Sequence, residues 1–257
     1  MSHPDPHARL PNQQIQLVVV QDELQPCHYR DQVARMPLRV PMGNVTPAAV
    51  DEMLMLGYRR SGDFVYRTQC PDCSACEPTR IAAQSFALTK SMKRVLKRGD
   101  RDLDCVIDVP ESESERVRLF NDHRQRRNLG DRCDLIDEDA YRSFVVASCF
   151  LTLEIAIYHS GQLVAVSIFD VGAESVSAFY TFFDQSFHRY SLGTYAILKQ
   201  LEWAKHQKIR FLYLGMFVED NRHLNYKSRF QPQQRLINGE WQDFNAPSDI
   251  AMFQNNK

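Results

Sequence analysis

The stretch Ser175-Val176-Ser177-Ala178-Phe179-Tyr180-Thr181-Phe182-Phe183 and the segment 191 to about 207 that follows it decide the fold. The first stretch is rich in β-branched and aromatic residues, which is typical of a strand. In the second, Leu198, Leu201 and Ala204 recur at helical spacing, which predicts an amphipathic helix. Three more strands are predicted, over residues 151–158, 163–169 and 211–214. Together these elements predict an α/β (α+β) fold.

Three meandering strands, a helix and a further strand resemble the core of the Gcn5-related acyltransferase fold. In that fold, free backbone amides at the N-terminus of the helix receive an anionic donor group. Arg189, Gly193 and Thr194 occupy this corner here, and Gly193 permits close approach to the backbone. The corner holds fewer glycines than the usual acetyl-CoA loop, which argues against coenzyme A as the donor.

The chain is predicted to have two parts between short tails. An acyltransferase-like domain is expected over residues 141–245, preceded by a smaller cysteine-containing module over residues 15–140. Within the module we expect a strand at 15–20, a helix at 47–56 capped by Thr46, and a strand at 64–67. Helices are expected at 89–98, 111–128 and 137–149, and a strand at 105–109. Residues 1–14 and 246–257 are expected to be tails.

Three cysteines lie at i, i+3 and i+6 in Cys70-Pro71-Asp72-Cys73-Ser74-Ala75-Cys76-Glu77-Pro78, and Cys27 lies upstream. Because proline breaks helices, the run is predicted to form a tight loop whose sulfur atoms converge. Converging thiolates are what a tetrahedral zinc site or an iron–sulfur cluster requires. We therefore predict a metal or cluster site at Cys27, Cys70, Cys73 and Cys76, with the choice between zinc and iron–sulfur left open. The alternative is a set of reduced thiols, partly redox-active.

Basic residues are concentrated just after the cysteines. The formal net charge of the chain is −1, so any affinity for nucleic acid has to come from a local patch. Residues 78–101 carry seven basic residues against one acid, which favours contact with phosphates over a merely solvated face. The candidate contacts are Lys90, Lys93, Arg94, Lys97 and Arg98.

The N-terminal residues are polar and hold three prolines, a composition that does not fit a signal peptide. The most apolar stretch, 144–158, is interrupted by polar residues and is too short to span a membrane. We expect a cytoplasmic protein without membrane attachment. The residues leave the oligomeric state open.

Several short stretches, in order along nearly the whole chain, resemble the bacterial aminoacyl-tRNA–protein transferases. This family includes the aspartate/glutamate leucyltransferases and is related to eukaryotic arginyltransferase. The matching stretches are Gly57-Tyr58-Arg59-Arg60-Ser61-Gly62, Tyr66-Arg67 with the three cysteines and Pro78-Thr79-Arg80-Ile81, Ala178 to Asp184, Ser191 to Leu198, and Asn225-Tyr226-Lys227-Ser228-Arg229-Phe230-Gln231-Pro232.

The resemblance implies transfer of leucine from leucyl-tRNA to the N-terminal Asp or Glu of acceptor proteins, which marks them for degradation by the N-end rule pathway. Arginyl-tRNA is the alternative donor. An acetyl-CoA-dependent N-acetyltransferase and a non-enzymatic RNA- or metal-binding module are the rival hypotheses. An aminoacyl ester is already activated, so the transfer itself needs no cofactor.

The resemblance also indicates candidate site residues. At least one of Arg59, Arg60, Arg67 and Arg80 is expected to bind the acceptor carboxylate; the alternative is that they serve backbone contacts or internal ion pairs. Tyr180 and Asp184 are the candidate catalytic residues; the alternative is that they are a strand residue and a turn residue. Arg189, Gly193 and Thr194 are expected at the donor site. Tyr226, Lys227 and Arg229 are expected to contact the terminal adenosine or its phosphate.

Overall fold

The computed structural model describes residues 7–9, 15–127 and 135–245. The predicted tails 246–257 and most of 1–14 lie outside the described residues. None of the described helices is long and apolar enough to cross a membrane.

One sheet of eight strands organises the molecule, in the order β15-β14-β8-β13-β12-β11-β10-β9. Its strands are β8 (Glu77–Ala82), β9 (Asp104–Asp108), β10 (Leu151–His159), β11 (Gln162–Val171), β12 (Ser175–Phe183), β13 (Phe211–Phe217), β14 (Gln233–Ile237) and β15 (Glu240–Phe244). Every neighbouring pair is antiparallel except β12 and β13. The predicted meander, helix and returning strand are confirmed, and with them the α+β class.

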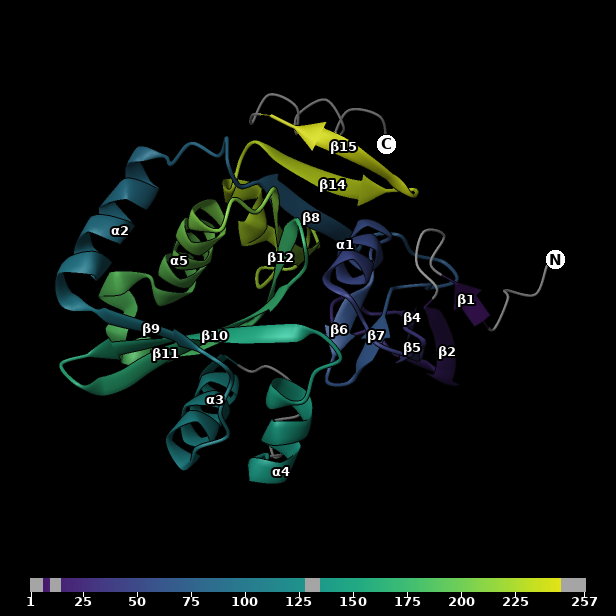
Figure 1. Ribbon diagram of the computed structural model, residues 1–257, viewed down its shortest axis with the longest axis horizontal. Helices are drawn as coiled ribbons and strands as arrows, with labels where there is room; N and C mark the ends of the chain where they lie inside the picture. Colours follow the sequence, from purple (N-terminus) through teal and green to yellow (C-terminus); the bar gives the residue numbers. More distant parts are fainter. Residues whose placement is uncertain (1–6, 10–14, 128–134, 246–257) are drawn as a thin grey trace.

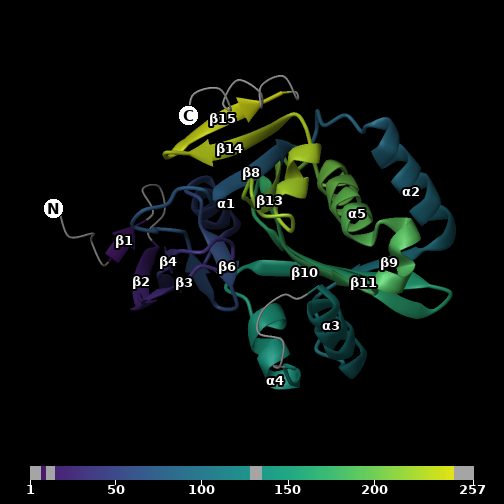
Figure 2. The same cartoon turned by 180° about the vertical axis from the view of Figure 1, so that it is seen from behind.

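Helices cover both faces of this sheet (Figures 1 and 2). On one face lie α5 (Leu192–His206) and α2 (Lys90–Asp102), whose buried side chains share a core with the central strands. Gly99 brings the two helices together, because any side chain at this position would meet the ring of Tyr195. On the other face lie α3 (Ser114–Arg127) and α4 (Glu138–Tyr141). The helix expected at 137–149 is shorter: α4 passes into a π-helical turn, η1 (Arg142–Val146).

A second, five-stranded sheet is built from N-terminal residues, in the order β1-β2-β5-β7-β6. Its strands are β1 (His7–Arg9), β2 (Gln16–Gln21), β5 (Leu38–Met42), β6 (Arg59–Ser61) and β7 (Phe64–Tyr66). Helix α1 (Pro47–Met55) packs against it, with the Thr46 side chain accepting a hydrogen bond from the Ala49 N–H at its start. A small hairpin, β3 (Leu24–Pro26) with β4 (Val33–Arg35), carries Cys27 in its turn.

Strand β8 comes from the N-terminal half of the chain but lies in the eight-stranded sheet, between β13 and β14. This strand comes directly from the cysteine loop, and β9 lies at the far edge of the same sheet. Strands from both sides of residue 140, where the sequence predicts a domain boundary, therefore share one sheet. Two short 3-10 helices complete the described fold: η2 (Gln185–Tyr190) and η3 (Asn225–Arg229).

Candidate active site at the strand opening

Strands β12 and β13 lie side by side over only part of their length. They pair from Ser175 with Phe211 to Ser177 with Tyr213. Beyond this point β12 stays paired with β11, and β13 stays paired with β8. The two strands therefore separate toward their C-terminal ends. We call the gap between residues 178–183 and 214–217 the strand opening.

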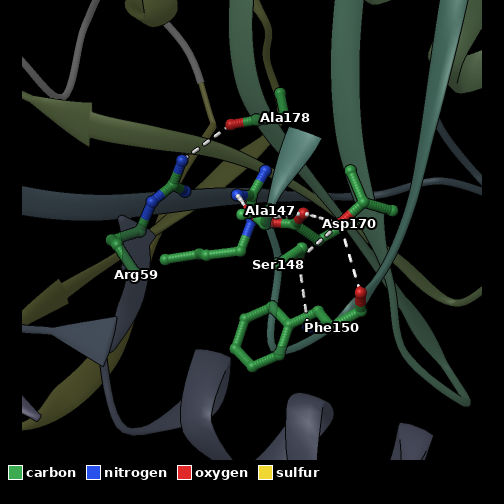
Figure 3. A network of polar contacts seen from close by, with 8 residues as sticks. Arg59, Ala147, Ser148, Phe150, Asp170 and Ala178 are labelled. Atoms are coloured by element: carbon green, nitrogen blue, oxygen red, sulfur yellow. Dashed lines mark hydrogen bonds and ion pairs between the residues drawn. The ribbon is translucent and has the colours of Figure 1, made fainter. Parts of the chain in front are cut away.

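Arg59, in β6, reaches into the strand opening. Its Nη2 atom donates a hydrogen bond to the carbonyl oxygen of Ala178 at 2.6 Å (Figure 3). A Cβ atom at Gly215, on β13, would lie 3.3 Å from the Arg59 guanidinium, so glycine there leaves room for it. Arg59 is 8% exposed, and its burial lowers the pKa of the guanidinium. Within the described residues no carboxylate forms an ion pair with Arg59, in contrast to Arg60, which pairs with Asp170 at 2.8 Å.

Lys227, in η3, is a second buried cation close to Arg59. It is 4% exposed, and no ion pair connects it to any residue that the structure describes. Burial lowers the pKa of its ammonium group to about 7, and the charge of Arg59 adds to this effect. Two buried cations that form no direct ion pair with a described carboxylate are unfavourable unless an anion binds beside them, although the charge of Asp170 acts on Arg59 from a greater distance. The arrangement is therefore suited to a negatively charged ligand.

Tyr180 and Asp184 differ in their surroundings. Tyr180 packs among aromatic rings, with the centroid of Phe120 at 5.3 Å, and burial raises the pKa of its phenol. The charges of Arg124 and Arg127 oppose this rise, so basic residues of α3 lie near it. Asp184 caps η2 by accepting a hydrogen bond from the Ser186 N–H at 2.9 Å. Its carboxylate thus has the turn role that was the alternative to catalysis, while a catalytic role stays a prediction for both residues.

The other arginines expected at the acceptor site are held by internal partners. Arg80 lies between the rings of Phe211 and Trp241, each centroid 4.0 Å from its guanidinium carbon, and donates a hydrogen bond to Gln234. Arg67 lies over the ring of Tyr58 at 5.2 Å. Arg60 is paired with Asp170, so of the four expected arginines only Arg59 donates a hydrogen bond into the strand opening.

The corner before α5 has the strand, turn and helix that the sequence predicts, while its role as the donor site stays a prediction. Helix α5 begins at Leu192, and the Thr194 N–H donates to the Ser191 carbonyl at 2.8 Å. A Cβ atom at Gly193 would lie 3.3 Å from the ring of Phe183, the last residue of β12. Arg189 lies over the ring of Tyr190, with 4.6 Å between its guanidinium carbon and the centroid.

Comparison with known proteins identifies the family of the chain. Residues 25–94 match the family model described as arginine-tRNA-protein transferase, N terminus, and residues 115–237 match its C-terminal counterpart. The chain belongs to the arginine-tRNA-protein transferase family. Among its relatives is an aspartate/glutamate leucyltransferase from Polynucleobacter asymbioticus, 34% identical over 84% of this chain and 90% of that protein. Another from Acinetobacter baumannii is 32% identical over 89% of this chain and 86% of that protein.

Solved structures share the fold of this transferase at low sequence identity. One is the crystal structure of FemX, which aligns with a TM-score of 0.50 and 8% sequence identity. The alignment covers 80% of this chain and 70% of the FemX chain. This likeness concerns the fold alone.

The predicted tRNA contacts of the transferase lie on one helix. Lys90, Lys93, Arg94 and Lys97 are exposed on α2, and they form no ion pair with the residues that the structure describes. Arg98 instead donates a hydrogen bond to the carbonyl oxygen of Arg189, which joins α2 to the corner before α5. Helix α2 thus presents four free cations on its outer face.

The four predicted metal ligands of the transferase gather at the cysteine loop. The Cys27, Cys70 and Cys73 sulfur atoms each accept a backbone N–H, from Tyr29, Arg35 and Ala75, at 3.4–3.5 Å. Burial raises the pKa of the Cys76 thiol to about 12, and the other three thiols add to this rise. All four are free thiols. In the part of the chain that the structure describes, no three His, Cys, Asp or Glu side chains are arranged to hold a metal ion. Four cysteine thiols are suitable ligands for zinc or an iron–sulfur cluster. The metal site stays a prediction.

Sequence reasoning missed two features near the site. The β14–β15 hairpin has Asn238 and Gly239 in its turn, both at positive φ, and this dipeptide is a strong hairpin signal. Glu219 also escaped notice, because no spacing pattern connects it to Arg229, although both line one cavity.

Proposed function

We propose that the chain transfers leucine from leucyl-tRNA to the N-terminal Asp or Glu of acceptor proteins, and so marks them for degradation by the N-end rule pathway. The relatives from Polynucleobacter and Acinetobacter, which bear the name aspartate/glutamate leucyltransferase, support this donor and these acceptors. The structural observation that carries the proposal is the pair of buried cations, Arg59 and Lys227, at the strand opening. A site that has to hold the 3′ end of a tRNA needs such charges.

The reaction replaces the ester bond of the aminoacyl-tRNA with a peptide bond. The α-amine of the acceptor attacks the ester carbonyl carbon of the aminoacyl-tRNA, and the bond between that carbon and the ribose oxygen breaks. The products are a peptide bond and a tRNA with a free terminal hydroxyl, which receives the proton that the amine loses. Because the α-amine has a pKa near 8, a sizeable fraction is neutral near pH 7. The protein therefore mainly has to align the amine with the ester.

Arg59 and Lys227 are assigned to stabilise the negative charge that develops during the reaction. The ester carbonyl oxygen gains negative charge as the amine adds, and a fixed cation in a water-poor site stabilises that charge more strongly than one in water. Binding of the anionic tRNA end beside Lys227 would also favour its protonated form. Tyr226, next to Lys227, offers a ring on which the terminal adenine can stack.

The exposed cations of α2 are assigned to the body of the tRNA. Four free basic side chains on one helix face form a surface that a phosphate backbone can follow. The Arg98 hydrogen bond connects this helix to Arg189, on the loop between β12 and α5. A tRNA held along α2 would therefore reach the strand opening from the α5 side.

A transfer assay tests the proposal. Radiolabelled leucine and arginine, each charged on its tRNA, are offered to peptides that differ only in their first residue. Leucine transfer to Asp and Glu starts, without transfer to an Ala start, is the expected result. Arginine transfer would support the alternative donor, which the name of the family model favours. Transfer of neither amino acid, with acetylation from acetyl-CoA in its place, would overturn the proposal.

A further inference from the structure

A cavity of about 280 Å³ lies between the end of β13, η3 and β14. Its lining includes Phe217 and Glu219 at the end of β13, Tyr226 and Arg229 in η3, and Arg235 in β14. We call it the η3 cavity. Pockets for drug-sized molecules usually start at about 300 Å³, so this one suits a group the size of one or two amino acids.

Two of the three charged residues that line the η3 cavity remain available to a ligand. Arg235 is committed to the protein: its guanidinium carbon lies 3.6 Å from the ring centroid of Phe217, and it pairs with Glu77 at 3.2 Å. Arg229 and Glu219, by contrast, form no ion pair with any of the described residues, and both are exposed. The cavity thus offers one cation and one carboxylate that form no ion pair with the described residues, although the charge of Glu219 also acts on Arg235.

This pair of opposite charges favours the acceptor protein over the tRNA as the ligand of the cavity. A tRNA 3′ end carries only negative phosphates, which the Glu219 carboxylate would repel. The first residue of an acceptor protein carries a positive α-ammonium and, in Asp or Glu, a negative side chain a few bonds away. Arginine matches a carboxylate in a bidentate geometry, and a carboxylate accepts hydrogen bonds from an ammonium group. The charges of the cavity complement an acidic N-terminal residue.

The η3 cavity also adjoins the strand opening. Tyr226 lines the cavity, and Lys227 follows it in the chain. Burial raises the pKa of the Tyr226 phenol, and the charges of Arg127 and Arg59 oppose that rise, so Arg59 lies close to this ring. A residue held in the cavity would therefore lie next to the strand opening, where the aminoacyl ester is proposed to bind.

We infer that the η3 cavity is the binding site for the first residue of the acceptor, with Arg229 holding the side-chain carboxylate and Glu219 holding the α-ammonium until transfer. This inference rests on the proposed transfer to N-terminal Asp or Glu, and it moves Arg229 and the lining residue Tyr226 from the tRNA end to the peptide. Glu219 has no role in the activity as proposed above.

Steady-state transfer kinetics provide the first test. Arg229→Ala and Glu219→Gln are each expected to raise the KM for an Asp-starting peptide about tenfold or more, with the KM for leucyl-tRNA unchanged. Arg222→Ala, which removes an exposed arginine outside the cavity, is the matched control and should change neither constant. If Arg229→Ala raises the KM for leucyl-tRNA instead, the cavity holds the tRNA end and the inference is wrong.

Reversal of one charge gives a sharper result. Arg229→Glu is expected to lower transfer to Asp and Glu starts and to raise transfer to Lys or Arg starts, because the side-chain partner has changed sign. Loss of transfer to all peptides alike, in a variant that keeps the wild-type melting temperature, would contradict the assignment.

A binding measurement without tRNA separates this inference from the proposed function. Fluorescent peptides that start with Asp, with Ala or with N-acetyl-Asp are titrated into the full chain. Binding of the Asp peptide at least tenfold tighter than that of the other two supports the cavity, even if no aminoacyl-tRNA is a donor. Equal binding of all three peptides overturns the inference, even if leucine transfer is observed.

Discussion

At the scale of single residues, burying Lys227 as an ammonium ion costs free energy because the protein solvates a charge less well than water. An anion that binds beside Lys227 and Arg59 would lower this free-energy cost, which favours its binding. Arg60, one residue along from Arg59, shows the contrast, since its buried charge is already paired with Asp170. Neighbouring arginines in one strand therefore differ: Arg60 is held in an internal ion pair, and Arg59 is assigned to a substrate only by the proposed function.

Lys227→Met is expected to raise the free energy of unfolding, and to raise it more at about pH 7 than at about pH 9.5. The pKa of about 7 in the folded protein lies below the ordinary lysine pKa of 10.5. Between these values the unfolded chain binds the proton more tightly, so the stability of the wild-type protein increases with pH. The advantage of the methionine variant should shrink by up to about 3 kcal/mol over that interval. Urea unfolding at the two pH values measures it.

Lys97→Met, on the exposed face of α2, is the control for this experiment, and its effect on stability should be the same at both pH values. An equal effect of Lys227→Met at both values would show that the buried amine does not lose its proton in this range.

The cysteine residues allow a direct test of the predicted metal site. We expect anaerobically purified protein to hold zinc or iron in a near-stoichiometric amount, and Cys70→Ser to remove most of it, because a site with four thiolate ligands rarely keeps its metal with three. Elemental analysis measures the content. Cys105→Ser, a change in β9 away from the loop, should leave it unaltered. Wild-type protein without metal, with all four thiols open to alkylation, would refute the prediction.

At the scale of secondary-structure elements, α2 combines a packing face with the face proposed to bind tRNA. Its inner face, with Met92 and Leu96, belongs to the core that α5 shares, while its outer face carries the free cations. Close packing at Gly99 fixes the helix on α5, and thus fixes the outer face relative to the corner before α5. A basic surface held in this way can set the orientation of a bound tRNA as well as its affinity.

Replacing Lys93 and Lys97 by alanine is expected to weaken binding of leucyl-tRNA. Each phosphate contact that is lost should reduce the slope of log affinity against log salt by about one. Fluorescence anisotropy at several salt concentrations measures both quantities. Arg118→Ala, on the exposed face of α3, is the matched control and should leave the slope unchanged. An unchanged slope in the double variant would place the tRNA elsewhere.

Elements with strong local signals were predictable from the sequence. Helix α1 has its cap at Thr46 and a glycine, Gly57, at φ +84° after its end, and the pattern alone located both ends closely. The short strands β3, β4 and β6 have three residues each and little periodicity, so nothing in the sequence separates them from loops. Helix α4 was predicted too long because Val145 and Val146 continue an apolar pattern after the α-helical bonds have ended.

The candidate site was predictable only in part, for a physical reason. Lys227 and Arg59 were found through the resemblance of short stretches to a family, whereas their burial and proximity depend on β12 and β13 separating. Such contacts between distant segments leave no local pattern. Arg80 illustrates the opposite error: an arginine expected to bind substrate is held between Phe211 and Trp241.

At the scale of the whole molecule, the eight-stranded sheet depends on both halves of the chain. A fragment of residues 141–257 would lack β8, and β13 and β14 would then have no strand between them. We expect this fragment not to unfold cooperatively, as followed by circular dichroism during thermal melting. Co-expression with residues 1–140 should restore a cooperative transition. A cooperative melt of the fragment alone would show that the C-terminal part folds independently.

The position of β8 also has a consequence for how the protein is made. At about 5–20 residues per second, a ribosome completes β13 roughly ten seconds after β8, because about 130 residues separate them. During this interval the nascent strand has neither of its neighbours, and the cysteine loop that leads into it has no completed sheet behind it. Synthesis speed, and the chaperones that meet the emerging chain, would then govern how much active enzyme a cell obtains.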